Sequence, residues 1–169
     1  MRCCHHDDRL ASARARLTTG VFFAGLRRII HLAEDMKGAP VEEARTYLTK
    51  AVESLTSARI DFAAARYNSC ANRAYYARFH AAVAALLAAG ICPASPCGEW
   101  SHEFVQSQFN GLLIICRKLY PAALRRVLRD MMAVREKTDH TPASVSARLA
   151  SRVLYAAQEF VRAIQEKGR

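Results

Sequence analysis

Long apolar stretches, glycine and proline are all scarce in this chain. The longest apolar stretch, from Phe79 to Cys92, contains His80 and Gly90 and is shorter than the ~18 residues that a transmembrane helix needs. With 7 glycines, 5 prolines and 51% hydrophobic residues, the composition is that of a globular protein and not of a disordered one. We therefore expect a soluble protein with no membrane-spanning segment.

The chain also lacks an evident secretory signal and a metal-binding pattern of cysteines. Cys92 and Cys97 are not accompanied by a second pair at zinc-finger spacing, and the adjacent side chains of Cys3–His6 cannot easily surround one tetrahedral ion. We therefore expect no metal and no cofactor. Without a secretory signal, the cysteines are expected to be reduced thiols in a cytoplasmic protein. The six are Cys3, Cys4, Cys70, Cys92, Cys97 and Cys116.

No segment shows the alternation of apolar and polar residues that is typical of strands. Apolar residues instead recur every three or four positions, which is the spacing of one helix face. A chain of 169 residues can bury a single core without metal or disulfide support. The sequence therefore predicts an all-α fold, and the short connections favour an antiparallel helical bundle.

Local signals give the expected helix boundaries. The apolar stripe Ala44, Leu48, Ala51, Leu55, Ala58 and Phe62 belongs to a first helix, and Val145, Leu149, Val153, Ala156, Phe160 and Ile164 belong to the last, with Arg148, Arg152 and Arg162 facing solvent. Gly90 is expected to end the second helix and Ser101 to cap the third. The helices are predicted over residues 40–64, 67–89, 102–119 and 121–139, and from Thr141–Pro142 onward. Residues 1–39 are expected to be an N-terminal extension, in which Val21–Met36 forms one helix, and residues 40–169 the bundle.

The net charge of +10 is concentrated near the C-terminus, because residues 117–169 carry twelve basic and five acidic side chains. A local positive excess attracts polyanions such as RNA, and such binding weakens with salt. The composition also allows a basic solvated face with no role in nucleic-acid binding.

An arginine and a histidine separated by four residues, Arg135 and His140, lie in this basic stretch. A guanidinium suits phosphate and an imidazole exchanges a proton near neutral pH, so the pair could cleave RNA. On an unbroken helix the two lie about 140° apart. Both can reach one phosphate only if the helix ends near His140, as Pro142 favours, or if a second subunit completes the site. The alternative is an Arg135–Asp139 ion pair, with His140 merely at a helix end.

A second arginine and histidine, Arg73 and His80, lie in the predicted central helix. Seven helical steps place them within about 20° on the same face but ~10.5 Å apart along the axis. Because aromatic side chains such as Tyr76 surround them on a mostly apolar helix, a buried hydrogen-bond network is favoured over a phosphate site. His102, next to an expected helix start, is likewise interpreted as structural.

The segment Asn72–Leu87, which contains Tyr75-Tyr76-Ala77, resembles the second helix of small prokaryotic HEPN-domain proteins. The similarity extends over about residues 41–166. It also includes Tyr47, Leu48, Ala58, His102, Phe109, Arg135 and Asp139.

What the resemblance implies is a HEPN-like bundle of four to five core helices that forms homodimers and often acts beside an MNT-type nucleotidyltransferase antitoxin. Ribonucleases of this family use an arginine, a following polar residue and a histidine four to six positions on. Arg135, Glu136 and His140 occupy those positions in this sequence.

The leading hypothesis is a metal-independent endoribonuclease that is the toxin of a toxin–antitoxin pair. In it Arg135, Glu136 and His140 are catalytic, and the upstream side chains Arg125, Arg126 and Arg129 hold the RNA backbone. The rival hypothesis is a non-catalytic HEPN module that binds a nucleotide, RNA or a nucleotidyltransferase partner. A helical scaffold with no ligand is a third alternative.

Overall fold

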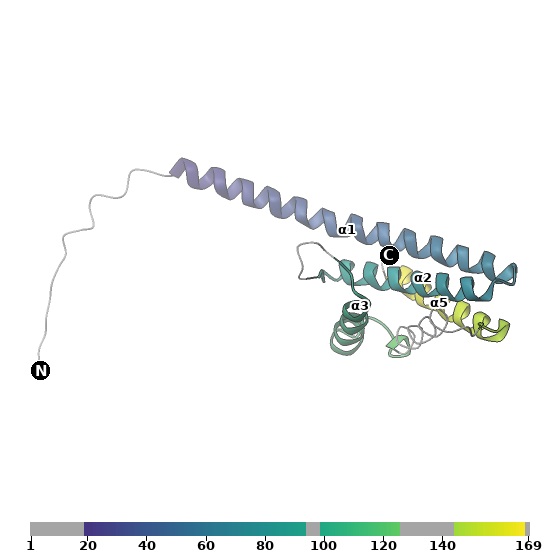
Figure 1. Ribbon diagram of the computed structural model, residues 1–169. Helices are drawn as coiled ribbons and strands as arrows, with labels where there is room; N and C mark the ends of the chain where they lie inside the picture. Colours follow the sequence, from purple (N-terminus) through teal and green to yellow (C-terminus); the bar gives the residue numbers. More distant parts are fainter. Residues whose placement is uncertain (1–18, 94–98, 126–143, 168–169) are drawn as a thin grey trace, which may run out of the picture. The chain divides into compact units, whose positions relative to one another are not determined.

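The computed structural model describes residues 19–93, 99–125 and 144–167, and of residues 19–40 it describes the backbone only. The internal contacts divide the chain into two units, Met1–Lys37 and Gly38–Arg169, and the side-chain contacts below lie within the second. Every regular element in the described ranges is a helix, so the predicted all-α fold is confirmed (Figure 1). None of these helices is long and apolar enough to cross a membrane. The elements are α1 (Thr19–Ala63), α2 (Tyr67–Ala88), α3 (His102–Gln108), the π-helix η1 (Phe109–Cys116) and α5 (Ala147–Lys167).

Helix α1 is longer than the sequence predicts. It begins at Thr19 and continues through Pro40, which we expected to begin a helix, so that expectation was wrong. A proline inside a helix removes one backbone donor and its ring crowds the carbonyl four residues earlier, at a cost of about 3 kcal/mol. The neighbouring residues include Ala33, Met36 and Ala44, which all favour helical geometry.

The part of α1 that belongs to the second unit packs its predicted stripe into the core. Ala44, Ala51, Leu55 and Ala58 are buried, and Leu48 and Phe62 of the same stripe are partly buried against them. Three of the four buried side chains are alanines, so the neighbouring helix can approach the α1 backbone closely. The apolar periodicity was therefore a correct guide to this face.

The connection from α1 to α2 is built around one buried carboxylate. Asp61 is 8% exposed and accepts hydrogen bonds from the Ser69 hydroxyl at 2.5 Å and from the Arg66 guanidinium at 2.6 and 2.8 Å. The Ser69 hydrogen bond and the Arg66 charge lower the pKa of Asp61 below its usual value, despite the opposing effect of burial. The carboxylate thus holds the first turn of α2 to the last turn of α1.

Helix α2 is the central element, as predicted, and is covered on nearly all sides. All seven residues from Ala81 to Leu87 are buried. The helix ends where Gly90 adopts a φ of +74°, a left-handed conformation that suits glycine. The prediction that Gly90 stops this helix is therefore confirmed.

The third predicted helix changes its geometry halfway. Ser101 caps α3 as expected, since its hydroxyl accepts a hydrogen bond from the Phe104 amide at 3.1 Å. From Phe109 the chain is a π-helix and not the continuous α-helix that we predicted. Phe109, Leu113 and Ile114 are all buried, and their spacing of four and five residues matches the wider π turn, which brings them to one face.

Helix α5 begins at Ala147 and not at Pro142. Thr141 and Pro142 lie outside the described residues, but Ser144–Ser146 are described and are not helical. The Ser146 hydroxyl accepts a hydrogen bond from the Leu149 amide at 3.3 Å. Ser146 therefore caps a helix that begins later in the sequence than we predicted. Of the predicted helix over residues 121–139, only Leu124 and Arg125 are described as helical, and the part after Arg125 lies outside the described residues.

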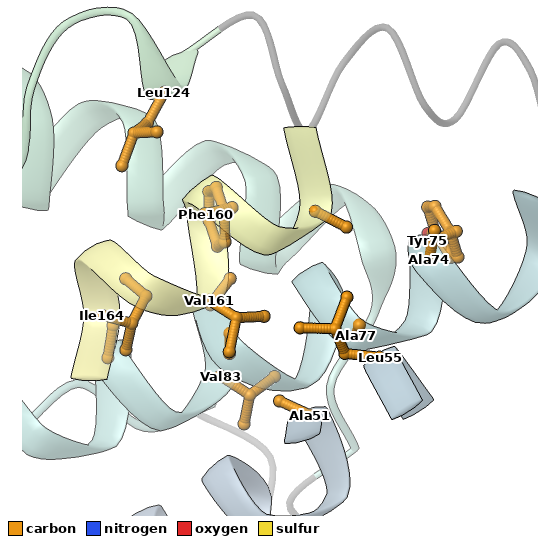
Figure 2. Packing of buried hydrophobic residues seen from close by; sticks show 14 of the residues in the cluster. Ala51, Leu55, Ala74, Tyr75, Ala77, Val83, Leu124, Phe160, Val161 and Ile164 are labelled. Carbon is orange, nitrogen blue, oxygen red and sulfur yellow. The ribbon is translucent and has the colours of Figure 1, made fainter. Parts of the chain in front are cut away.

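The core forms mainly between α2 and α5, which lie side by side (Figure 1). Figure 2 shows Val83 and Ala77 of α2 near Val161 and Ile164 of α5. Phe160 is fully buried, and its ring lies 5.2 Å from that of Phe109. On the outer side of α5 the arginines Arg148, Arg152 and Arg162 are exposed, as predicted.

We predict that Phe160→Ala lowers the free energy of unfolding by about 3–5 kcal/mol, because it leaves a cavity between α5 and η1. Tyr155→Ala on the same helix removes a side chain that is 64% exposed and should cost less than about 1 kcal/mol. Urea denaturation followed by circular dichroism measures both. Equal losses in the two variants would contradict this packing.

Candidate functional site

The residues that the sequence singles out for catalysis lie between two described segments. Arg135, Glu136, Asp139 and His140, like the expected RNA-binding residues Arg126 and Arg129, fall within residues 126–143, outside the described residues. Arg125, the remaining expected RNA contact, is described and is exposed.

Both flanks of this segment are held by the core of the bundle. On the N-terminal side Leu124 is 9% exposed, and the ring of Tyr120 stacks on Phe109 with centroids 5.3 Å apart. On the C-terminal side Val145 is 5% exposed, and its amide donates a hydrogen bond to Oδ1 of Asn68 at 2.7 Å. Val145, five residues after His140 in the sequence, is therefore held against the first turn of α2.

Three of the other candidate residues, Tyr76, His80 and His102, lie in a group of rings that we call the aromatic–histidine cluster. It lies where α1, α2 and α3 meet. Its members contact one another with ring centroids 4.6 to 6.5 Å apart. They are Tyr47, Tyr75, Tyr76, Phe79, His80, Trp100 and His102.

Within this cluster His102 joins α3 to α2. Its Nδ1 lies 2.6 Å from the Tyr75 hydroxyl, and its ring centroid lies 4.6 Å from that of Phe79. At this distance a phenol and an imidazole form a hydrogen bond in either histidine tautomer, because each group can act as the donor or as the acceptor. His102 thus packs against α2 and forms a hydrogen bond with it. A structural role of this kind is what we expected from the sequence.

His80, also in the cluster, lies near the rings of Tyr47 and Tyr76, each with its centroid 6.0 Å away. Burial lowers the pKa of His80 below its usual value, and the nearby positive charge of Lys50 lowers it further, while a hydrogen bond that the imidazole donates to the Lys50 backbone carbonyl opposes the shift. Its Nδ1 is buried without a hydrogen-bond partner among the described residues. The imidazole is therefore mainly uncharged at neutral pH.

Arg73 and His80, although on one helix, lie in different surroundings. Arg73 is exposed, and its charge contributes to lowering the pKa of Asp61 at the α1–α2 connection. His80 is half buried among aromatic rings. The structure thus associates Arg73 with a carboxylate and His80 with the cluster, and it shows no shared site for the two.

One buried charge was not recognised from the sequence. Arg78 is 2% exposed, and its guanidinium donates a hydrogen bond to the carbonyl of Val153 on α5 at 2.5 Å. Burying a guanidinium is favourable only when it is hydrogen-bonded, so this contact holds α2 and α5 in one register. The signal in the sequence was an arginine within a mostly apolar helix, but helical periodicity alone does not identify its partner.

We predict that acid destabilises the fold through His80 as the pH falls below about 6.5. Because its pKa is lowered in the folded state, the unfolded chain binds the proton more tightly, and the contribution of His80 to stability is present above its unfolded pKa and lost below it. In His80→Gln the loss of stability between about pH 6.5 and pH 5 should be smaller, as measured by urea denaturation at each pH. The same pH dependence in both proteins would show that another group titrates.

Comparison with known proteins gives the family of this bundle. The HEPN domain model matches residues 44–167, a span that contains the aromatic–histidine cluster, Arg78 and the segment from Arg135 to His140. The chain is also 30% identical over 125 residues to a protein of Methanocaldococcus jannaschii named "Putative toxin MJ0605", a match that covers 74% of this chain and 88% of that protein. The chain therefore belongs to the HEPN-domain family.

Proposed function

We propose that this protein is a metal-independent endoribonuclease and the toxin of a toxin–antitoxin pair. The observation that carries the proposal is the Arg135–Glu136–His140 spacing, which falls inside the span matched by the HEPN domain. The relative named as a toxin supports the biological role. An MNT-type nucleotidyltransferase is the antitoxin partner that the family resemblance suggests.

In the proposed reaction the RNA supplies its own nucleophile. The 2′ oxygen attacks the neighbouring phosphorus and loses its proton, while the bond from phosphorus to the 5′ oxygen breaks and that oxygen gains a proton. His140 serves one of these two proton transfers, and Arg135 stabilises the negative charge that grows on the phosphate oxygens. Glu136 orients the two side chains.

The spacing of the catalytic pair sets a condition on this mechanism. Five steps on an unbroken helix would separate Arg135 and His140 by about 140°. The non-helical stretch Ser144–Ser146 separates α5 from the preceding segment, which is in keeping with a break in helical structure after the motif. The pair must act either where the helix ends near His140, as Pro142 favours, or between two subunits of a homodimer.

The charges near the proposed site favour an RNA substrate. Arg125 is exposed at the N-terminal flank, and Arg148 and Arg152 are exposed on the first turns of α5. Arg162, near the other end of α5, instead forms an ion pair with Glu159 at 2.6 Å. We therefore expect Arg125, together with Arg126 and Arg129, to contact the RNA backbone without reading its sequence.

We predict that the purified protein cleaves single-stranded RNA in the presence of EDTA. Arg135→Ala and His140→Ala should each slow cleavage by roughly 10²–10⁴-fold. An oligonucleotide of the same sequence made of DNA should stay intact, because it has no 2′ hydroxyl. Gel analysis of end-labelled substrates measures all of these.

Arg162→Ala is the matched control, since it removes an exposed arginine of α5 that is paired with Glu159 and lies outside the motif. It should keep most of the cleavage rate. Cleavage that persists in both motif variants would come from another site or a contaminant, and an inactive wild type that still binds RNA or nucleotide would support the non-catalytic module instead.

A further inference from the structure

A hollow that the ribonuclease proposal does not use lies among α1, α2 and α5. Its volume is about 410 Å³, and residues of all three helices line it together with Leu119 and Tyr120 of the segment after η1. Sites that bind small molecules have volumes of roughly 300–1,000 Å³, so the hollow is large enough for a small ligand. We call it the three-helix hollow.

The walls of the three-helix hollow are mostly apolar. Leu48 of α1 and Ile164 of α5 line it, and so does Val41, which is 50% exposed. Exposed apolar side chains at such a place are typical of a contact surface for a partner or ligand. The remaining apolar lining consists largely of alanines, whose single methyl groups leave space between the helices. These are Ala44, Ala84, Ala85, Ala88 and Ala89.

Within the described part of the chain, the polar side chains that line the hollow are Arg45, Tyr120 and Lys167. Both cations are exposed. Arg45 has an ion pair with Glu42 at 3.5 Å, but these two side chains are about three-quarters exposed, so the pair offers little resistance to another anion. Two cations beside an apolar hollow are complementary to a ligand that has one anionic head and an apolar body.

Tyr120 adds a hydroxyl that lacks a partner within the described residues. The side chain is 9% exposed, burial raises its pKa, and the hydroxyl forms no hydrogen bond with another described residue. The phenol is therefore protonated at neutral pH and can donate a hydrogen bond. Buried hydroxyls in proteins are nearly always hydrogen-bonded, so a ligand with an acceptor oxygen would satisfy this group.

The helix ends at the hollow favour a carboxylate over a phosphate. Ala88 and Lys167, the last residues of α2 and α5, both line it, so the negative ends of two helix dipoles lie there. These dipoles oppose a doubly charged head, and phosphate sites instead use the amides of helix N-termini. A polyanion such as RNA needs basic side chains along its whole length, and two are too few.

We propose that the three-helix hollow binds a fatty acid, with the aliphatic chain against the alanines of α2 and the carboxylate held by Arg45 and Lys167. The inference rests on the volume, the apolar walls, the two cations and the Tyr120 hydroxyl. It does not depend on the ribonuclease activity, so a binding measurement tests it whether or not the protein cleaves RNA.

The first experiment titrates the full chain with octanoate, decanoate and dodecanoate in an isothermal calorimeter. Binding should saturate at one ligand per chain, and each added CH₂ should tighten it by up to about fourfold until the hollow is full. 1-Decanol has the same chain as decanoate without the charge and should bind roughly tenfold more weakly. A wild type that binds no decanoate, as when a second protein chain covers the hollow, would overturn the proposal, and so would equal affinities for decanoate and 1-decanol.

The second experiment uses exposed residues, so that loss of folding cannot imitate the result. Arg45→Gln and Lys167→Gln should each weaken decanoate binding by roughly threefold and leave 1-decanol binding unchanged. Arg59→Gln is the matched control, because Arg59 is an exposed arginine of α1 that does not line the hollow, and it should bind decanoate as the wild type does. The same affinity for decanoate in all four proteins would rule out the proposed carboxylate contacts.

A variant that fills the hollow tests the position of the aliphatic chain. Ala88 lines the hollow and is exposed, so Ala88→Leu can fold and should weaken both decanoate and 1-decanol by on the order of tenfold. Ala63→Leu adds the same side chain at an exposed position of α1 outside the hollow and should change neither affinity. Wild-type affinities in Ala88→Leu would place the ligand elsewhere and overturn the proposal.

Discussion

The burial of α2 on nearly all sides is the constraint on which the other contacts depend. Its small alanine side chains let α1 and α5 approach, but a helix surrounded in this way needs specific neighbours for most of its polar side chains. Its hydrogen bonds accordingly lead to different parts of the bundle. Asn68 bonds the flank before α5, Tyr75 bonds α3 through His102, Arg78 bonds α5 through Val153, and the carbonyl of Ala89 accepts from Arg117 after η1.

Much of this fold could be predicted because its signals are local. Helical periodicity identified the buried face of α1, and the chemistry of single residues identified the stop at Gly90 and the cap at Ser101. The two errors have different causes. Pro40 lies within α1 among residues that favour helical geometry. From Phe109 tertiary packing overrides local preference, and the chain adopts a π-helix because the wider turn directs three apolar side chains to the core.

The sequence shows the residue types of the candidate site but not their surroundings. The arginine and histidine of the motif are visible in the sequence, and so is the pair formed by Arg73 and His80. Arg73 helps to lower the pKa of Asp61, whereas His80 lies among tyrosine rings. This difference depends on how α2 packs against α1, and the spacing of residues within α2 cannot reveal it. The same holds for Arg78, whose partner is 75 residues away in the sequence.

The two flanks of the motif are both fixed by the bundle, and this bears on how the catalytic pair could be assembled. Before the motif, Leu124 is buried and Tyr120 stacks on Phe109, and after it the Val145 amide is held by Asn68 on the first turn of α2. Five steps on an unbroken helix would separate Arg135 and His140 by about 140°. The proposed pair can therefore act on one phosphate only where the helix ends near His140 or where a second subunit supplies one of the two side chains.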